Sequence, residues 1–270
     1  MPVTISAFYK FVTVSDGSDL RARLLATCDL HQIKGTILIA PEGLNASIAG
    51  SGEAVQGLLA LLRSDPRFAD LESKESFAAE PPFQRLKIKL KREIVTFGAT
   101  GADPAILTGT YVAPEDWNAL IQDPSVVVVD TRNAYEVRVG TFPGARDPQT
   151  RAFNEFPDYV TAALDPRTHS KVAMFCTGGI RCEKASAYLL SQGFKEVYHL
   201  KGGILKYLET VPREQSLFEG ECFVFDQRVA LDHGVVEGTH ELCSVCGHPV
   251  ARSDSDADQH VTTCPNCAAA

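Results

Sequence analysis

The chain has 270 residues, of which 44% are hydrophobic and 22% charged, and its formal net charge is −8. That length exceeds a typical domain, so we expect two or three compact units. No apolar run approaches the roughly 20 residues that cross a bilayer, and the first residues do not resemble a signal peptide. The sequence therefore favours a cytoplasmic protein with no membrane partner, whose eight cysteines are reduced thiols or metal ligands.

The acidic charge is concentrated near the C-terminal end. Residues 214–270 contain two basic and ten acidic side chains, whereas residues 1–100 contain 12 basic and 11 acidic ones. The overall charge therefore does not exclude a nucleic-acid partner for the first part of the chain.

Residues 1–97 alternate strand and helix patterns. The predicted elements are a strand over 5–14, a helix over 20–31, strands over 35–40 and 45–49, a helix over 53–62 and a strand over 86–91. The order strand, helix, two strands, helix, strand predicts an α+β ferredoxin-like domain.

The last of these strands alternates strictly between apolar and basic residues, which places Lys87, Lys89 and Lys91 on one face. Successive ammonium groups about 7 Å apart roughly match the spacing of backbone phosphates, so this face is a candidate RNA-binding stripe. The alternative is a solvated face, or an edge strand that its lysines protect against aggregation.

A segment rich in Gly, Ala and Thr at 98–109 is expected to be a linker. Residues 110–213 then alternate β and α patterns. The apolar runs at 126–129 and 171–175 are typical of parallel strands buried on both faces. Open parallel sheets bind ligands beyond the carboxyl ends of their strands, and Cys176 directly follows the second run.

Cys176 opens a short loop between a strand and a helix. Glycines in this loop can turn main-chain N–H groups inward, the helix adds its positive end, and Arg181 adds a full charge. Together they favour the thiolate and a pKa below the free value of roughly 8.5, which makes Cys176 the expected catalytic nucleophile. The expected anion cradle consists of Thr177, Gly178, Gly179 and Ile180. The alternative is a buried structural cysteine.

The spacing Cys176-x4-Arg181 resembles the active-site loop of rhodanese sulfurtransferases. Other segments resemble further landmarks of that fold, namely Asp130-Thr-Arg132, Glu136, 140–145 and 200–203. Related phosphatases use a loop that is one residue longer, whereas position 182 here is cysteine, so the loop is sized for sulfur chemistry. The resemblance implies a parallel-sheet α/β rhodanese-like domain over 110–213.

Three segments in order, 35–45, 176–184 and 219–228, together resemble the bacterial rhodanese-domain tRNA uridine hydroxylase family. Membership implies hydroxylation of C5 of uridine 34 in tRNA by molecular oxygen, with Cys176 essential and carrying a persulfide-type intermediate. The first domain would then help to hold the anticodon arm. Two other interpretations stay open, a persulfide-forming sulfurtransferase that serves a small or protein acceptor, and a non-catalytic RNA- or protein-binding module.

The remaining thiols and one histidine near the site have two interpretations each. Cys182 is either a resolving thiol for Cys176 or a packing residue, and His199 is either a proton carrier or structural. Cys28 and Cys222 are expected in cores. The sequence carries no flavin or nicotinamide motif.

An acidic tail over 214–270 carries two Cys-x2-Cys pairs that 17 residues separate. This spacing is typical of a four-thiolate structural zinc site. Its expected ligands are Cys243, Cys246, Cys264 and Cys267, with His248 and His260 as possible substitutes. The alternative is four reduced cysteines on a flexible tail.

Overall fold

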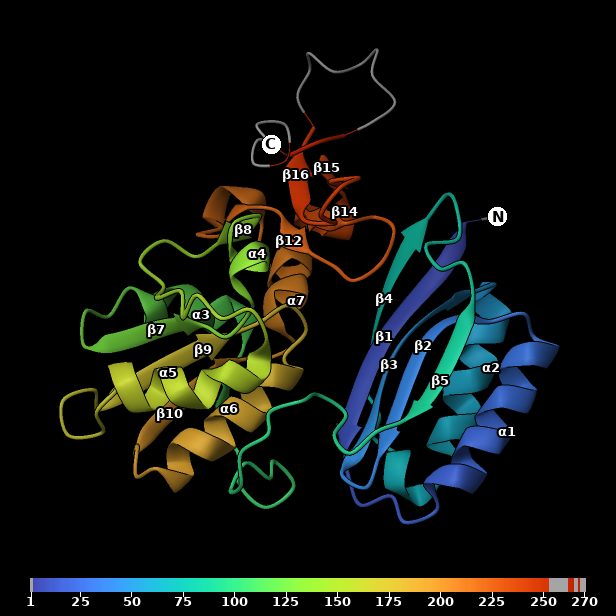
Figure 1. The fold of residues 1–270 in the computed structure, drawn as a ribbon, viewed down its shortest axis with the longest axis horizontal. Helices are drawn as coiled ribbons and strands as arrows, with labels where there is room; N and C mark the ends of the chain where they lie inside the picture. Colours follow the sequence, from blue (N-terminus) through green and yellow to red (C-terminus); the bar gives the residue numbers. More distant parts are fainter. Residues whose placement is uncertain (1, 253–261, 265–266, 268–270) are drawn as a thin grey trace. The chain divides into compact units, whose positions relative to one another are not determined.

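The computed structural model describes residues 2–252, 262–264 and 267. The chain divides into two compact units, Met1–Thr96 and Phe97–Ala270 (Figure 1). Within the described residues, every helix is too short or too polar to span a bilayer.

The first unit is a five-stranded sheet with both of its helices on one face (Figure 1). Its elements are β1 (Val3–Phe11), α1 (Gly17–Leu30), β2 (Lys34–Ala40), β3 (Gly43–Gly50), α2 (Gly52–Arg63), a 3-10 turn (Pro66–Phe68), β4 (Ser73–Ala78) and β5 (Leu86–Leu90). The strand order is β4-β1-β3-β2-β5, and β1 to β4 pair antiparallel. These four strands and two helices confirm the predicted ferredoxin-like α+β class.

The predicted strand over 86–91 exists as β5, but it is not the fourth strand of the ferredoxin-like order. β5 pairs parallel with β2 at one edge of the sheet. The fourth place belongs to β4, which pairs with β1 at the opposite edge. β4 was missed because its sequence, SKESFA, is mostly small and polar and lacks an apolar alternation.

Alternation along the strands builds the core of this unit. On β2, Ile37 and Ile39 are buried in one cluster with Leu20 and Leu24 of α1. α2 begins after Ser51, whose hydroxyl accepts a hydrogen bond from the Ala54 N–H at 3.2 Å. The buried residues of this helix are Ala54, Val55, Leu58, Leu59 and Leu62.

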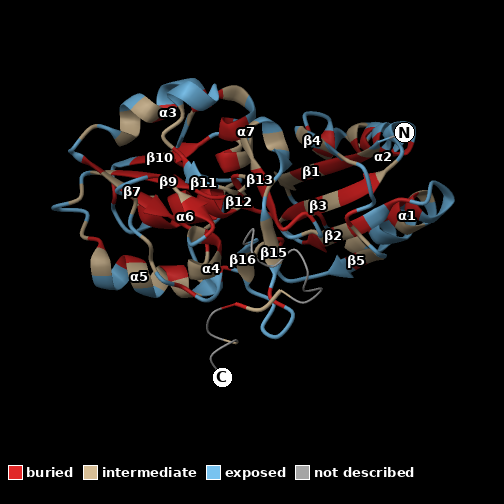
Figure 2. Ribbon diagram, turned by 90° about the horizontal axis from the view of Figure 1, so that it is seen from above, coloured by how far each residue is buried: buried red, intermediate tan, exposed pale blue. Residues whose placement is uncertain are grey.

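The second unit is built on a four-stranded sheet in which every pairing is parallel. Its elements are β6 (Thr110–Val112), α3 (Pro114–Ile121), β7 (Val126–Asp130), α4 (Ala134–Val137), β8 (Gly140–Thr141), a 3-10 turn (Phe153–Glu155), α5 (Phe156–Ala163), β9 (Lys171–Phe175), α6 (Ile180–Ser191), β10 (Glu196–Leu200) and α7 (Gly203–Thr210). The strand order is β6-β10-β9-β7, with α3 and α7 on one face and α5 and α6 on the other (Figure 2). The expected parallel α/β sheet is confirmed.

The chain after α7 contributes short strands and turns to the same unit. They are a 3-10 turn (Arg213–Gln215), β11 (Glu219–Gly220), β12 (Cys222–Phe223), β13 (Ala230–Asp232), a 3-10 turn (His233–Val235), β14 (Val236–Glu237), β15 (His240–Leu242) and β16 (Pro249–Ala251). Phe218 and Cys222 join the core around Trp117 and Phe142, as the core interpretation of Cys222 expects. β11 pairs with β8, so this part of the tail completes the domain.

The expected linker over 98–109 forms no helix or strand. Its end is nevertheless held against α6, because the Ser186 hydroxyl accepts a hydrogen bond from the Gly109 N–H at 2.9 Å and lies 3.1 Å from Thr108 Oγ1. Just before it, the Phe97 ring packs against the rings of Phe153 and Tyr188.

Candidate active site

Cys176 lies at the carboxyl end of β9, and α6 begins four residues later. The turn between them depends on Gly179, which caps α6 at a φ of +103° that side chains other than glycine rarely adopt. The loop therefore brings Cys176 against the first amides of α6, where the helix dipole favours negative charge.

The first residues of a second helix, α7, also hold this loop in place. The N–H groups of Ile204 and Leu205, at the start of α7, donate to the carbonyls of Cys176 and Thr177 at 2.9 and 3.1 Å. This close approach requires glycine at position 203, because a Cβ there would lie 2.5 Å from the Cys176 oxygen. The last glycine of the 200–203 landmark is therefore needed for this close contact between α7 and the loop.

The sulfur of Cys176 is almost completely buried, at 1% exposure. The Gly179 N–H donates to Cys176 Sγ at 3.1 Å. Burial opposes ionisation, but the Cys182 thiol, the Arg181 charge, and the amides of Cys182 and Gly179 outweigh it and lower the pKa of Cys176 to about 5. The arrangement therefore holds a thiolate at neutral pH.

Arg181 is oriented by a buried carboxylate. Both of its terminal nitrogens donate to the two oxygens of Glu136 at 2.7 Å, and Nη2 lies 3.4 Å from Thr177 Oγ1. Glu136 is fully buried on α4, where it also closes a capping box with Asn133. Sequence reasoning treated Glu136 as a landmark of the fold and missed its role as the partner of Arg181. The available signal was the Asn-x-x-Glu capping pattern.

The loop residues of the predicted cradle differ in exposure. Gly179 is buried, whereas Thr177, Gly178 and Ile180 are half-buried. A Cβ added at Gly178 would meet nothing within 4 Å, so the loop has free space at this position. The Asp130-Thr-Arg132 landmark is a fully buried ion pair beside the loop.

His199 is almost completely buried, and its pKa is lowered to about 4 by burial. Its Nε2 lies 3.2 Å from the Gly109 oxygen and 3.4 Å from Thr108 Oγ1, which favours the structural interpretation. Cys28 is buried in the core of the first unit, where burial raises its pKa to about 11.

Of the three candidate RNA-binding lysines, Lys87 and Lys89 lie within β5 and Lys91 directly follows it. Ile88 between them is buried in the helix-facing core, so Lys87 and Lys89 lie on the opposite face of the sheet, beside Thr36 and Leu38 of β2. Lys89 and Lys91 are exposed and Lys87 is half-buried.

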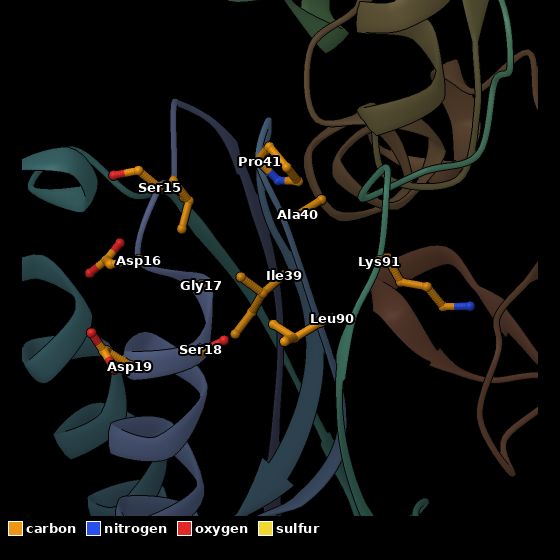
Figure 3. A pocket seen from close by; sticks show the side chains of 11 residues that line it. Ser15, Asp16, Gly17, Ser18, Asp19, Ile39, Ala40, Pro41, Leu90 and Lys91 are labelled. Carbon is orange, nitrogen blue, oxygen red and sulfur yellow. The ribbon is translucent and has the colours of Figure 1, made fainter.

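A pocket of about 380 Å³ lies in the first unit, between the β1–α1 loop and the ends of β2 and β5. Figure 3 shows Ile39 and Leu90 in its wall, with Lys91 extending away from them. Asp16 and Asp19 also line the pocket, and Asp16 forms an ion pair with Arg67. The pocket is therefore lined by both acidic and basic side chains, and one of its two carboxylates is already paired.

The four tail cysteines form a compact group, in which all sulfur atoms lie within 4.8 Å of one another. Cys246 Sγ and Cys264 Sγ are 3.7 Å apart. Two thiolates on a tetrahedral zinc ion, each at about 2.3 Å, are separated by about 3.8 Å, so the group fits a metal ion. The amides of Cys246 and Cys264 donate to Cys243 Sγ and lower the pKa of Cys243 to about 6, which also suits a thiolate ligand.

Of the two possible substitute ligands, His248 and His260, the structure describes only His248. The ring of His248 stacks on Tyr135 of α4, with a centroid distance of 5.9 Å. His260 lies outside the described residues. The turn that carries the first cysteine pair is closed by the Gly247 N–H, which donates to the Cys243 oxygen at 2.8 Å.

Known protein families match the sequence of each of the two units. Residues 3–94 match the UPF0176 acylphosphatase like domain, and residues 113–210 match the rhodanese-like domain. The chain is 55% identical to a tRNA uridine(34) hydroxylase of Teredinibacter turnerae, over 97% of this chain and 83% of that protein. The chain belongs to the tRNA uridine(34) hydroxylase family. A second member, from Albidiferax ferrireducens, is 54% identical over 97% of this chain and 84% of its own length.

The motifs by which the sequence resembles the hydroxylase family have definite places in the fold. The 35–45 segment forms β2 and the tight turn into β3, while 176–184 forms the loop that begins at Cys176 and the start of α6. The 219–228 segment forms β11 and β12 beside that loop, because Thr177 Oγ1 lies 3.5 Å from the Phe223 oxygen. Two of the three family segments therefore meet at the cysteine.

Proposed function

We propose that this chain hydroxylates C5 of uridine 34, the wobble position of tRNA, and uses molecular oxygen as the oxidant. The observation that carries the proposal is the buried Cys176 sulfur, which accepts a hydrogen bond from the Gly179 N–H, in a chain that matches tRNA uridine(34) hydroxylases over 97% of its length. The chain is then an oxidoreductase of the rhodanese-like class that acts on tRNA in the cytoplasm.

In this proposal Cys176 is the reacting group. The amides of Gly179 and Cys182 and the charge of Arg181 stabilise negative charge on its sulfur, so the nucleophile is ready at neutral pH. The same donors would stabilise a persulfide or another anion that forms at this position. Glu136 is a positioning residue, because it touches Arg181 rather than the sulfur.

The anticodon arm of the tRNA is the proposed partner of β5. Lys87 and Lys89 lie on one side of the edge strand β5, at a spacing of about 7 Å that roughly matches backbone phosphates, and Lys91 directly follows the strand. Contacts of this kind are sensitive to salt and carry no sequence preference. Lys89→Glu is therefore expected to weaken binding of tRNA in general and to reduce its dependence on salt.

Zinc is the proposed metal of the tail, held by the four cysteines of the group. Four thiolates complete a tetrahedral shell and leave no open position, so the ion supplies folding energy rather than catalysis.

The test is nucleoside analysis by mass spectrometry of tRNA from a deletion strain of the source organism. The proposal expects 5-hydroxyuridine derivatives to disappear, to return with the native gene and to stay absent with Cys176→Ala. Cys28→Ala serves as the matched control, since it removes a buried thiol from the other unit. A normal nucleoside profile in the deletion strain would refute the proposal. Thiocyanate release from a persulfide donor, lost in Cys176→Ala, would then favour the sulfurtransferase.

A further inference from the structure

Hydroxylation by molecular oxygen needs two electrons in addition to those of the uracil C5–H bond. One oxygen atom enters the product and the other leaves as water, so a donor of two electrons must act in each turnover. A pair of thiols that closes to a disulfide supplies that number. Two cysteines of the second unit lie in the arrangement that this chemistry requires.

Cys182 is the third residue of α6 and faces Cys176 across the loop. Its thiol and its main-chain N–H both lower the pKa of Cys176, so both act on the Cys176 sulfur. The two sulfurs are buried together, with exposures of 1% for Cys176 and 0% for Cys182. The two thiols therefore share one buried site at the start of α6.

The surroundings keep the two sulfurs chemically different. Thr131 Oγ1, which donates to the Phe175 oxygen, lies 3.5 Å from Cys182 Sγ. Burial and the neighbouring Cys176 thiolate raise the pKa of Cys182 well above its ordinary value. The pair is thus one thiolate and one thiol, rather than two thiolates that repel each other.

We infer that Cys176 and Cys182 form a redox pair that supplies the two electrons for hydroxylation and closes to a disulfide in each turnover. The inference rests on the proposed function. The O–O bond breaks, one oxygen forms the C5–OH bond, and the S–S bond forms. The Cys182 thiol supplies one proton of the water, and solvent supplies the other in place of the proton that Cys176 has already lost.

An external dithiol returns the pair to its reduced state by thiol–disulfide exchange. The free space beside Gly178 gives the loop a side without a bulky residue. Cys222 is differently placed, since its thiol donates to the Phe223 oxygen at 3.8 Å and its pKa is raised to about 12, mainly by burial.

A single-turnover experiment tests the inference with the full-length chain. The protein is reduced, freed of reductant without air, mixed with an unmodified tRNA transcript that carries uridine 34, and exposed to air-saturated buffer. Trypsin cleaves after Arg181, so the disulfide would join the peptide 172–181 to the peptide 182–184. Product is measured as 5-hydroxyuridine, and the joined peptides are measured after alkylation of free thiols.

The wild-type chain is expected to form close to one product per chain and an equal amount of joined peptides. Cys182→Ser is expected to form at least about tenfold less product, because its partner sulfur cannot close the bond. Cys28→Ala should behave like the wild type, and circular dichroism of Cys182→Ser reports whether that variant is folded.

Two results overturn the inference alone, namely product from wild-type protein whose two thiols both stay alkylatable, and wild-type amounts of product from Cys182→Ser. Absence of product from the wild type, even with excess dithiol present, overturns the proposed function and the inference together.

Discussion

The buried ion pair between Arg181 and Glu136 provides the sharpest test of how the site is held. Each terminal nitrogen of Arg181 donates to one carboxylate oxygen at 2.7 Å, and both side chains are almost completely buried. Glu136→Gln removes the negative charge while keeping the shape. Loss of one partner from such a pair costs about 3–5 kcal/mol, because the remaining charge is left buried without compensation.

For a unit of this size, that loss lowers Tm by roughly 6–20 °C. The assay is thermal and urea unfolding of the full-length chain, followed by probes within the second unit. Glu219→Gln is the control, since Glu219 is exposed, and it should change stability by less than about 0.5 kcal/mol. Glu136→Gln combined with Arg181→Met should be more stable than Glu136→Gln alone, because the double variant buries no unpaired charge.

The pair also predicts a dependence on pH. Burial opposes ionisation of Glu136, but Arg181 outweighs it and holds the pKa of Glu136 below its usual range. A carboxyl with a lowered pKa in the folded state stabilises the protein above its unfolded pKa of about 4.3 and loses that contribution as the pH falls. Glu136→Gln should remove this acid-dependent loss. A variant that unfolds like the wild type at neutral pH would refute the reasoning.

Three further outcomes follow from the site. The rate of Cys176 alkylation by iodoacetamide should be half-maximal near pH 5. Cys182→Ala should move that midpoint to higher pH, because the Cys176 thiolate loses a hydrogen-bond donor. An unchanged midpoint would contradict this role of Cys182. Gly203→Ala should lower the free energy of unfolding in urea by more than about 2 kcal/mol, because the φ of Gly203 is +69° and a Cβ there would lie 2.5 Å from the Cys176 oxygen. Gly178→Ala should lower it by less, because a Cβ at Gly178 has free space. The purified chain should contain one zinc per molecule by elemental analysis, and Cys246→Ser should lower that content; equal metal in both proteins would exclude the cysteine group as the site.

Local patterns predicted those parts of the fold whose signals are local. The apolar runs at 126–129 and 171–175 became β7 and β9, because a strand buried on both faces needs continuous apolar residues. The Cys-x2-Cys pairs likewise predicted the sulfur group, since two cysteines at this spacing can offer both sulfurs to one metal ion. In these cases a few neighbouring residues carry all of the information.

Features that depend on tertiary contacts could not be predicted in this way. β4 is a strand because β1 offers it a partner, although its own sequence has little β-propensity. Glu136 becomes the partner of Arg181 only when α4 folds against the loop that begins at Cys176, since the two residues are 45 positions apart in the chain. The effect of Cys182 on the pKa of Cys176 also depends on the shape of the turn, which the Gly179 backbone determines.

Tyr135 links two parts of the second unit that otherwise have separate chemistry. Its ring stacks on His248, which follows the first cysteine pair, and also packs edge-on against Phe223 of the family segment. The next residue along α4 is Glu136, which accepts hydrogen bonds from both terminal nitrogens of Arg181. If the cysteine group holds the proposed zinc, loss of that metal would therefore be expected to weaken, through His248 and Tyr135, the support of the helix that orients Arg181.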